Sequence, residues 1–212
     1  MHEMFRVLGQ QMGLERVRGI LEESIDVYLN VAIKEIVSNI VKSNVQTVYK
    51  DKITIQDNPI SPVNGVSTLY KELETIANIP SGYTIDVVIP NVQYIFGFSV
   101  SYPGIKDFKQ CRFVESDRIG ITLDDYCSRP SKKYPIITVV NVDEQSDVYT
   151  FRIYSSKGII EKLRVNYIKT PATVSLEDNI SCDLPEHLHK DVVELAVQKY
   201  FNSVGSTSQN VR

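Results

Sequence analysis

Residues 24–44, "SIDVYLNVAIKEIVSNIVKSN", carry the strongest structural signal in the chain. Their apolar residues recur at spacings of three and four, which is the period of one broad helical face. The members of this face are Ile25, Leu29, Ala32, Ile33, Ile36, Val37, Ile40 and Val41. Ser24 is a suitable N-cap, and the charges of Asp26 and Lys42 suit the two ends of the helix dipole. We therefore predict a long amphipathic helix that must bury one face.

A second helical pattern lies at residues 182–205, "CDLPEHLHKDVVELAVQKYFNSVG". Asp183 is placed as its N-cap, Pro185 just inside the first turn and Gly205 at the end. The apolar residues fall on two overlapping stripes, the first with Leu188, Val192, Leu195 and Ala196, the second with Val193, Val197, Tyr200, Phe201 and Val204. An arc this wide fits two arrangements: the helix is covered on both flanks inside its own subunit, or one flank packs against a second subunit.

The middle of the chain, residues 46–170, has the composition of β-strands. Segments rich in β-branched and aromatic residues alternate there with turn signals such as "YPG" and "SSKG". The expected strands are 45–55, 84–90, 92–102, 134–142, 147–156 and 159–168. One helix is predicted at about residues 67–78, ahead of Pro80, which stops a helical pattern. The face of this helix would consist of Leu69, Leu73, Ile76 and Ala77.

Together these patterns predict an α+β fold around one elaborated core. The N- and C-terminal helices, residues 24–43 and 184–204, are expected to pack together, because each has a broad apolar face and no other long helix to cover it. An antiparallel β barrel or sandwich is inserted between them. The expected organisation is an N-terminal arm and helix at 1–45, a β-rich lobe at 46–170, a C-terminal helix at 171–205 and a flexible tail at 206–212.

The first 19 residues form a weaker pattern than the helix that follows them. They contain three glycines, and each glycine loosens a helix by about 1 kcal/mol relative to alanine. The same stretch carries apolar residues, among them Phe5 and Leu8. We predict that this segment and the polar tail after Gly205 do not order themselves within one subunit.

Composition argues against several classes of partner and location. The net charge of −3 comes from 23 basic and 26 acidic residues without blocks, so no broad cationic surface is expected for phosphate backbones or anionic lipid. Cys111, Cys127 and Cys182 are far apart and form no CxxC, which favours buried, reduced thiols and assembly in a cytosol. We expect neither a secretory signal nor a membrane span, because no apolar run approaches about 18 residues.

His187 and His189 raise the question of a metal site. They stand beside Glu186 and Asp191, in a chain with 3 histidines. Metal-binding pairs on helices are usually spaced i and i+4, whereas i and i+2 point about 200 degrees apart. We therefore predict that no metal or other cofactor is bound here, and that the histidines are solvated or meet an interface.

No arrangement of residues predicts catalysis. Glu115 and Asp117 would share a face of a strand, but no third carboxylate or lysine follows at a recognisable spacing, and Arg118 offers an ion pair instead. Asp124 and Asp125 would lie on opposite faces or in a turn. The chain has neither a GxSxG nucleophile motif nor a glycine-rich phosphate loop. The sequence therefore predicts a protein that is not an enzyme.

Both ends of the chain resemble a family of phage proteins. Residues 183–205 with their lead-in "YIKTPATVSLEDN", and the early "FRVLGQQMGLERVRGILEESIDVYLNVAI", are similar to the head-to-tail adaptor or neck ring proteins of tailed bacteriophages, especially crAss-like short-tailed phages. The strand with Tyr167, Lys169 and Pro171 before an "LPEHLH" helix start belongs to this resemblance. It covers about a third of the chain, and the β-rich middle is similar only in character.

The resemblance implies a structural virion protein that forms a homo-oligomeric ring, commonly twelvefold in the family. Such a ring is assembled in the host cytoplasm, docks on the portal protein and other neck or tail proteins, and surrounds a channel through which genomic DNA passes without sequence-specific binding. Candidate contacts to a neighbouring subunit or the portal are Phe5, Leu8, Val193, Val197 and Phe201. The alternatives are another tail component, such as a tube, hub or stopper subunit, and a phage-encoded hydrolase or nuclease.

Overall fold

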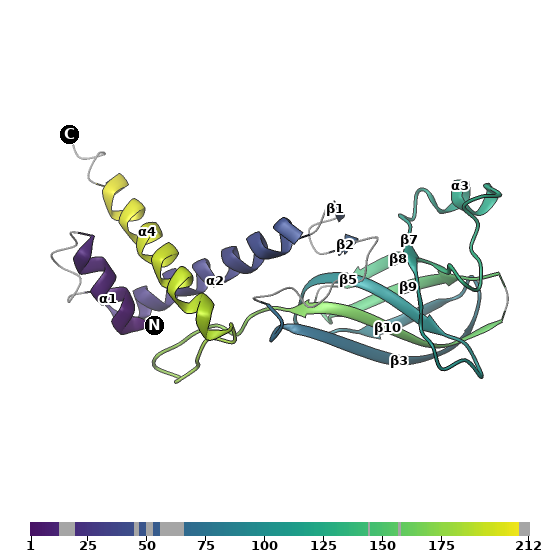
Figure 1. Ribbon diagram of the computed structural model, residues 1–212, viewed down its shortest axis with the longest axis horizontal. Helices are drawn as coiled ribbons and strands as arrows, with labels where there is room; N and C mark the ends of the chain where they lie inside the picture. The colour runs from purple at the N-terminus through teal and green to yellow at the C-terminus, as the bar shows by residue number, and fades with distance from the viewer. Residues whose placement is uncertain are drawn as a thin grey trace. The chain divides into compact units, whose positions relative to one another are not determined.

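The computed structural model describes residues 1–12, 20–44, 47–49, 53–55, 66–143, 145–156 and 158–207. The chain divides into two compact units (Figure 1). The helical unit comprises Met1–Asn44, Pro62–Leu69 and Pro171–Arg212, and the β unit comprises Val45–Ser61 and Tyr70–Thr170. The predicted α+β class is therefore confirmed, with terminal helices together in one unit.

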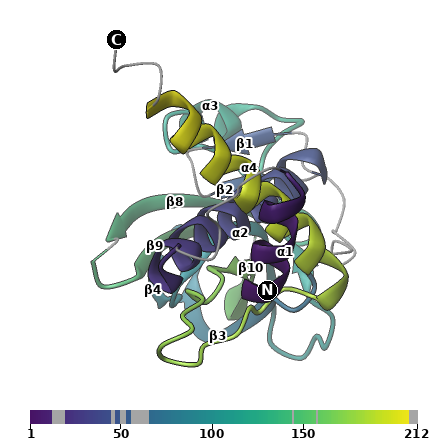
Figure 2. The ribbon, with the colours of Figure 1, turned by 90° about the vertical axis from the view of Figure 1, so that its left-hand side faces the viewer.

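In the helical unit, helices from the two ends of the chain pack against each other. The elements are α1 (His2–Gln11), α2 (Glu22–Asn44), the short 3-10 turn η2 (Glu186–Leu188) and α4 (His189–Thr207). Figures 1 and 2 show α4 beside α1 and crossing α2, and all three helices are in contact. The predicted pairing of the N- and C-terminal helices is confirmed.

Burial of the predicted stripes accounts for this packing. On α2 the fully buried residues are Ile25, Leu29, Ala32, Ile33, Val37 and Val41, and on α4 they are Val192, Val193, Ala196 and Val197. Each buried Val, Ile or Leu contributes about 1.5 to 3 kcal/mol. The first stripe of α4 and the N-terminal part of the second are thus covered within the chain, whereas Phe201 and Val204 of the second stripe are exposed. Among the described residues, no helix combines the length and apolar character needed to cross a bilayer.

The helix ends differ from their predicted positions. Helix α2 starts at Glu22, so Ser24 is inside the first turn, where its N–H donates to the Leu21 carbonyl at 3.0 Å. The N-cap position of the 3-10 turn before α4 is Pro185, and the predicted cap Asp183 accepts the Ala172 N–H at 3.3 Å through its carboxylate. Helix α4 continues through Gly205 to Thr207, since one glycine costs about 1 kcal/mol and earlier turns are anchored by packing. Residues 208–212 of the predicted tail lie outside the described residues.

The β unit consists of two sheets. Its strands are β1 (Thr47–Tyr49), β2 (Ile53–Ile55), β3 (Tyr70–Pro80), β4 (Thr84–Val88), β5 (Val92–Ser101), β6 (Lys109–Gln110), β7 (Arg112–Phe113), β8 (Ile136–Asp143), β9 (Val148–Tyr154) and β10 (Ile159–Lys169), with the short helix α3 (Ile119–Asp124) before β8. One sheet has the order β1-β2-β5-β10-β3 with β6 beside β5, and the other the order β4-β9-β8-β7.

The two sheets enclose a common core, as expected for the sandwich and not the closed barrel. Most pairs are antiparallel, but β2 with β5 and β7 with β8 are parallel. The core between the sheets includes Ile95, Phe98 and Val100 of β5, Leu163 and Val165 of β10, and Phe151 and Ile153 of β9. Strands β5 and β10 lie inside their sheet, and each is paired with neighbours on both of its edges.

The predicted helix at residues 67–78 is wrong. Most of this stretch belongs to β3, which pairs antiparallel with β10, so that Leu73 lies opposite Val165. Along β3 the partly buried and exposed side chains alternate, and Ile76 is 70% exposed. Pairing with β10 outweighs the helix propensity of residues such as Leu73, because propensities differ by less than about 1 kcal/mol per residue. Leu69, just before β3, is buried in a turn of the helical unit.

Candidate assembly surface on the helical unit

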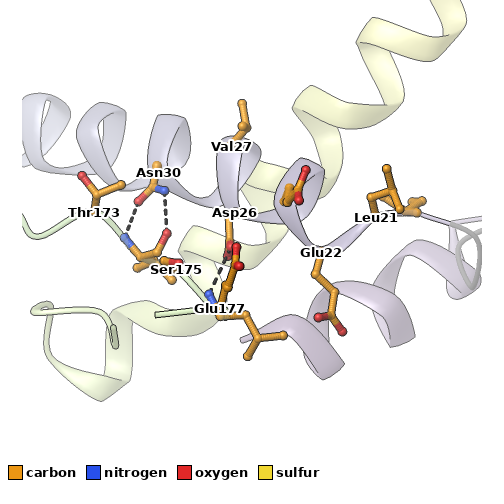
Figure 3. Close-up of a pocket in the computed structure, with 12 residues that line it drawn as sticks. Leu21, Glu22, Asp26, Val27, Asn30, Thr173, Ser175 and Glu177 are labelled. Carbon is orange, nitrogen blue, oxygen red and sulfur yellow. Dashed lines mark hydrogen bonds between the residues drawn. The ribbon is translucent and has the colours of Figure 1, made fainter. Parts of the chain in front are cut away.

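A loop after the β unit is fastened along the N-terminal half of α2. The Asn30 side chain accepts the Val174 N–H at 2.7 Å and donates to the Val174 carbonyl at 2.9 Å (Figure 3). One amide side chain thus satisfies both backbone groups of Val174, as a neighbouring strand would. We call this pair of hydrogen bonds between Asn30 and Val174 the clamp. Val174 itself is buried, and the clamp fixes where the next residues of the loop lie.

Asp26, one turn before Asn30, holds the same loop and also α1. Its Oδ2 atom accepts the Leu176 N–H at 3.1 Å, and its Oδ1 atom lies 2.7 Å from the His2 Nε2. The side chains of His2 and Asp26 are only 13% and 15% exposed. The carboxylate therefore joins three segments that are far apart in the sequence.

Between α2 and this loop lies a groove of about 720 Å³. Its exposed apolar lining is Leu21 and Val27, at 68% and 59% exposure, with Leu176 across the groove at 41%. The acidic residues Glu22, Glu23 and Glu177 also line it. No lysine or arginine is among the described residues that line it, but Glu22 forms an ion pair with Arg6 of α1 at 3.2 Å. Figure 3 shows Leu21 and Val27 on the helix side and Glu177 on the loop side. The groove thus combines apolar and anionic surface.

Further apolar side chains are exposed on α1 and α4. Met4 and Val7 on α1 are 41% and 54% exposed, and Phe201 and Val204 on α4 are 43% and 46% exposed. Exposed apolar side chains become informative where they gather on one surface, and these four lie on the two helices that pack against each other. Together with the groove, these residues form the candidate assembly surface.

The predicted interface residues divide into buried and exposed groups. Phe5, Val193 and Val197 are fully buried within the chain. A contact to another protein through them would require the helical unit to open, so this part of the prediction is withdrawn. Leu8 is partly buried, and Phe201 is exposed and stays a candidate contact.

The buried position of Phe5 also corrects the predicted N-terminal arm. Its ring meets Tyr200 edge-on, with centroids 6.1 Å apart. Tyr200 in turn packs against Tyr28 at 5.3 Å, and the Tyr28 hydroxyl is hydrogen-bonded to the Ser203 hydroxyl at 2.8 Å. The first 12 residues are thus ordered on α4 of the same chain. The remaining residues of the predicted arm, 13–19, lie outside the described residues.

The histidine pair has a local structural setting. Nε2 of His189 lies 3.0 Å from the Leu184 carbonyl, which positions the ring at the start of α4. His187 lies in the 3-10 turn before it. In the part of the chain that the structure describes, no three His, Cys, Asp or Glu side chains gather in a way that could hold a metal ion.

The carboxylates singled out from the sequence are dispersed over loops and turns. Glu115 lies 4.0 Å from the Arg118 guanidinium, as the predicted ion pair requires. Asp124 ends α3, and Asp125 follows it as the C-cap. Hydrogen bonds from the Ser128 hydroxyl and the Cys127 N–H, with help from the nearby charges of Arg112 and Arg129, lower the pKa of Asp125. This arrangement stabilises a turn.

The three cysteines are free thiols in different surroundings. Cys111 is buried in the β unit, and desolvation raises the pKa of its thiol far above the ordinary value. Cys182 is partly buried, and burial raises its pKa as well. Cys127 is exposed, so the prediction of buried thiols is wrong for this residue.

Comparison with known proteins adds no relative. No protein-family model matches the chain, and no curated protein matches it.

Sequence reasoning missed the groove and the clamp by Asn30, because the partner loop lies 144 residues away and has no periodic pattern. The sequence signal that could have indicated these contacts is the pair Asp26 and Asn30, one turn apart on the predicted helix. Asp and Asn side chains readily form hydrogen bonds with backbone N–H and C=O groups.

The clamp gives a testable stability prediction. Replacing Asn30 by aspartate keeps the acceptor for the Val174 N–H but removes the donor to the Val174 carbonyl, where two oxygens then face each other. We expect a loss of about 1 to 3 kcal/mol in the free energy of unfolding, measured by urea titration. Asn39→Asp is the matched control, because Asn39 is an exposed residue of the same helix. An equal effect of both substitutions would contradict a role of the clamp.

Proposed function

We propose that this chain is a structural subunit of a ring in the neck of a tailed bacteriophage, located between the portal and the tail. The ring would be homo-oligomeric, bind the portal and adjacent neck proteins, and surround the path of the DNA. The proposal rests on the resemblance of both ends of the chain to adaptor proteins. The observation that carries it is the apolar surface that the helical unit leaves exposed in the groove and on α1 and α4.

A closed ring requires two different faces on each subunit, because each copy contacts its neighbours head to tail. The candidate assembly surface offers two kinds of contact. The groove is apolar with anionic residues on its rim, whereas α1 and α4 expose apolar residues such as Val7 and Phe201. Two chemically different surfaces on one unit suit heterologous contacts better than a self-complementary pair.

The order of the helical unit also supports an assembly role. His2, Asp26 and Leu176 tie α1, α2 and the loop together, so the groove is formed within one subunit and needs no partner to shape it. A surface ordered before binding loses less conformational entropy when a neighbour arrives. This favours the growth of a ring by addition of folded subunits.

Imaging the protein in its particle tests the proposal directly. We expect density for the chain as a closed ring directly below the portal, and native mass spectrometry of the isolated complex should give a single ring stoichiometry. A position inside the tail tube or at a hub would assign the chain to another tail component. Absence from the finished particle would overturn the structural role.

A substitution pair tests whether the groove is an assembly contact. The double variant Val27→Ser/Leu176→Ser removes two of its three exposed apolar side chains and leaves Leu21. We expect the free energy of unfolding to change by less than about 1 kcal/mol, while incorporation into particles falls at least roughly tenfold, as losing a few kcal/mol of contact energy implies. Quantitative immunoblotting of purified particles measures incorporation.

The matched control lies in the β unit. Val88 and Ile76 are 60% and 70% exposed, so Val88→Ser/Ile76→Ser removes similar apolar surface from a place outside the groove. Incorporation of the control at the wild-type level, together with loss of the groove variant, supports the contact. Equal incorporation of the two variants would show that the groove is not part of the ring.

A further inference from the structure

The segment after α3 is a cationic, tyrosine-bearing loop in a chain of net negative charge. Residues 126–134, "YCSRPSKKY", contain three basic residues, two tyrosines and no acidic residue. Tyr126 and Tyr134 are 81% and 63% exposed. The basic residues Arg129, Lys132 and Lys133 are all exposed. Figure 1 shows α3, which leads into this loop, at the margin of the β unit.

Hydrogen bonds within the loop hold it in one conformation. The Arg129 N–H donates to the Asp125 carbonyl at 3.0 Å. Near its other end, the Ser131 N–H donates to the Tyr134 carbonyl at 3.1 Å, and the Tyr134 N–H donates back to the Ser131 Oγ at 3.0 Å. The Lys132 N–H donates to the Ser156 Oγ at 3.1 Å, which ties the loop to the end of β9. The cations are thus presented from an ordered backbone.

The positive charges of the loop are only partly balanced by the protein. Among the described residues, none of its three basic side chains forms an ion pair with a carboxylate. All three lie over tyrosine rings instead: the Arg129 guanidinium is 5.1 Å from the Tyr126 ring, the Lys132 Nζ is 5.4 Å from the Tyr102 ring, and the Lys133 Nζ is 5.3 Å from the Tyr134 ring. A cation over a ring keeps its charge and is held in place.

Two carboxylates flank the loop in sequence and offset part of this charge. The Asp125 carboxylate accepts the Cys127 N–H at 3.1 Å, and the nearby Arg129 charge helps to lower its pKa. With Asp124, which is exposed at the end of α3, it sets two negative charges against the three positive charges of the loop. The loop is therefore a small cationic site in a protein whose formal net charge is −3.

The chemistry that such a loop recognises is a phosphodiester backbone. Arginine, lysine and tyrosine side chains are donors to phosphate oxygens, and these contacts need no particular base sequence. Duplex DNA presents one negative charge about every 1.7 Å along its axis, so a loop with few cations meets phosphates in any register. Binding to an acidic protein would instead require a carboxylate of the partner opposite each cation. The loop has no buried apolar residue at its centre that would fix such a partner in position.

We propose that residues 126–134 make weak, sequence-independent contacts with the phosphate backbone of duplex DNA. The inference deepens the proposed function, on which it rests for its biological setting, by naming the segment of a ring subunit that meets the passing genome. With three cations the contact is weak and strongly salt-dependent, so DNA is guided without being held. Repetition of the loop around a ring would multiply the effect without adding affinity per subunit.

Fluorescence anisotropy with a labelled short duplex and the full-length chain tests the inference. Three phosphate contacts give a slope of about −2.7 for log affinity against log salt, which is a loss of about 40-fold between about 50 and about 200 mM salt. The variant Arg129→Gln/Lys132→Gln/Lys133→Gln should lose at least roughly tenfold in affinity at the lower salt. The control Lys34→Gln/Lys71→Gln/Lys106→Gln removes the same charge from exposed lysines outside the loop, and it should bind as the wild type does.

Cys127 provides a second readout inside the loop, because it is the exposed one of the three free thiols. Duplex DNA at low salt should slow its alkylation by a maleimide, and high salt should remove the protection. Tighter binding of an equally long single strand would assign the tyrosines to base stacking and overturn the assignment to duplex. Equal loss of affinity in both triple variants, or no protection of Cys127, would also overturn the inference.

These outcomes are separable from the proposed function. Normal incorporation of the loop variant into particles, together with absent DNA binding by the wild type, would overturn the loop assignment and leave the ring proposal standing. DNA binding by the wild-type chain, together with its absence from the neck, would overturn the ring proposal and leave the loop assignment standing. Binding of the loop to an acidic protein with no response to DNA would reject the phosphodiester ligand.

Discussion

Replacing Ile33 by aspartate should unfold the helical unit. Ile33 is 1% exposed on α2 and belongs to the stripe that faces the helical core. The substitution removes about 1.5 to 3 kcal/mol of apolar burial and adds the cost of burying an unpaired carboxylate, so a total loss of at least about 4 kcal/mol is expected. Circular dichroism at the helical minimum should show lost helix content in the absence of denaturant.

The control for this prediction lies on the opposite side of the same helix. Val31 is 45% exposed, and Val31→Asp introduces the same charge where water can solvate it. We expect its free energy of unfolding to stay within about 1 kcal/mol of wild type. A stably folded Ile33→Asp protein would mean that α2 does not form the core of the helical unit.

Replacing Phe5 by alanine should destabilise the helical unit by about 3 to 5 kcal/mol. The ring is fully buried and meets Tyr200 of α4 edge-on, so its loss leaves a cavity between two helices. Urea unfolding followed by circular dichroism measures the change. For the same reason, deletion of residues 1–18 should lower the melting temperature clearly, although the sequence alone predicted that this segment does not order itself within one subunit.

Val7→Ala distinguishes core packing from helix propensity in this segment. Val7 is also on α1 but 54% exposed. Alanine favours helix there, so we expect a change of less than about 0.5 kcal/mol. If Phe5→Ala proved as mild as Val7→Ala, α1 would not be anchored on α4, and the original prediction of an N-terminal arm that needs a neighbour would return.

Periodicity predicted the parts of the fold that depend on one helix face. The stripes of α2 and α4 required a mutual partner, and the two helices do pack together. The same reasoning failed at β3, where leucines and glutamates resemble a helix. Its partner β10 lies about 90 residues later in the chain, and the pairing of Glu74 with Lys162 and Arg164 across the two strands is not visible in local sequence.

Prediction of the candidate site was weaker because it depends on contacts between distant segments. Phe201 is exposed and stays a predicted contact, whereas Val193 and Val197 on the same stripe are buried. Their burial depends on α1 and the crossing angle of α2, which no residue pattern encodes. The groove arises only when residues 173–177 return to α2, and loops of this kind have no period that sequence analysis can detect.

The division of the helical unit into separated segments has a consequence for biosynthesis. The β unit is almost continuous, whereas α2 packs on a helix that follows it by more than 140 residues. During translation the β unit can therefore fold while α2 still exposes its apolar stripe, and the stripe is covered only after α4 leaves the ribosome. Contacts of such long sequence separation form slowly. A chain that stops before α4 keeps that stripe in water, where chaperones and proteases recognise it, so we expect prematurely terminated chains to be removed soon after synthesis.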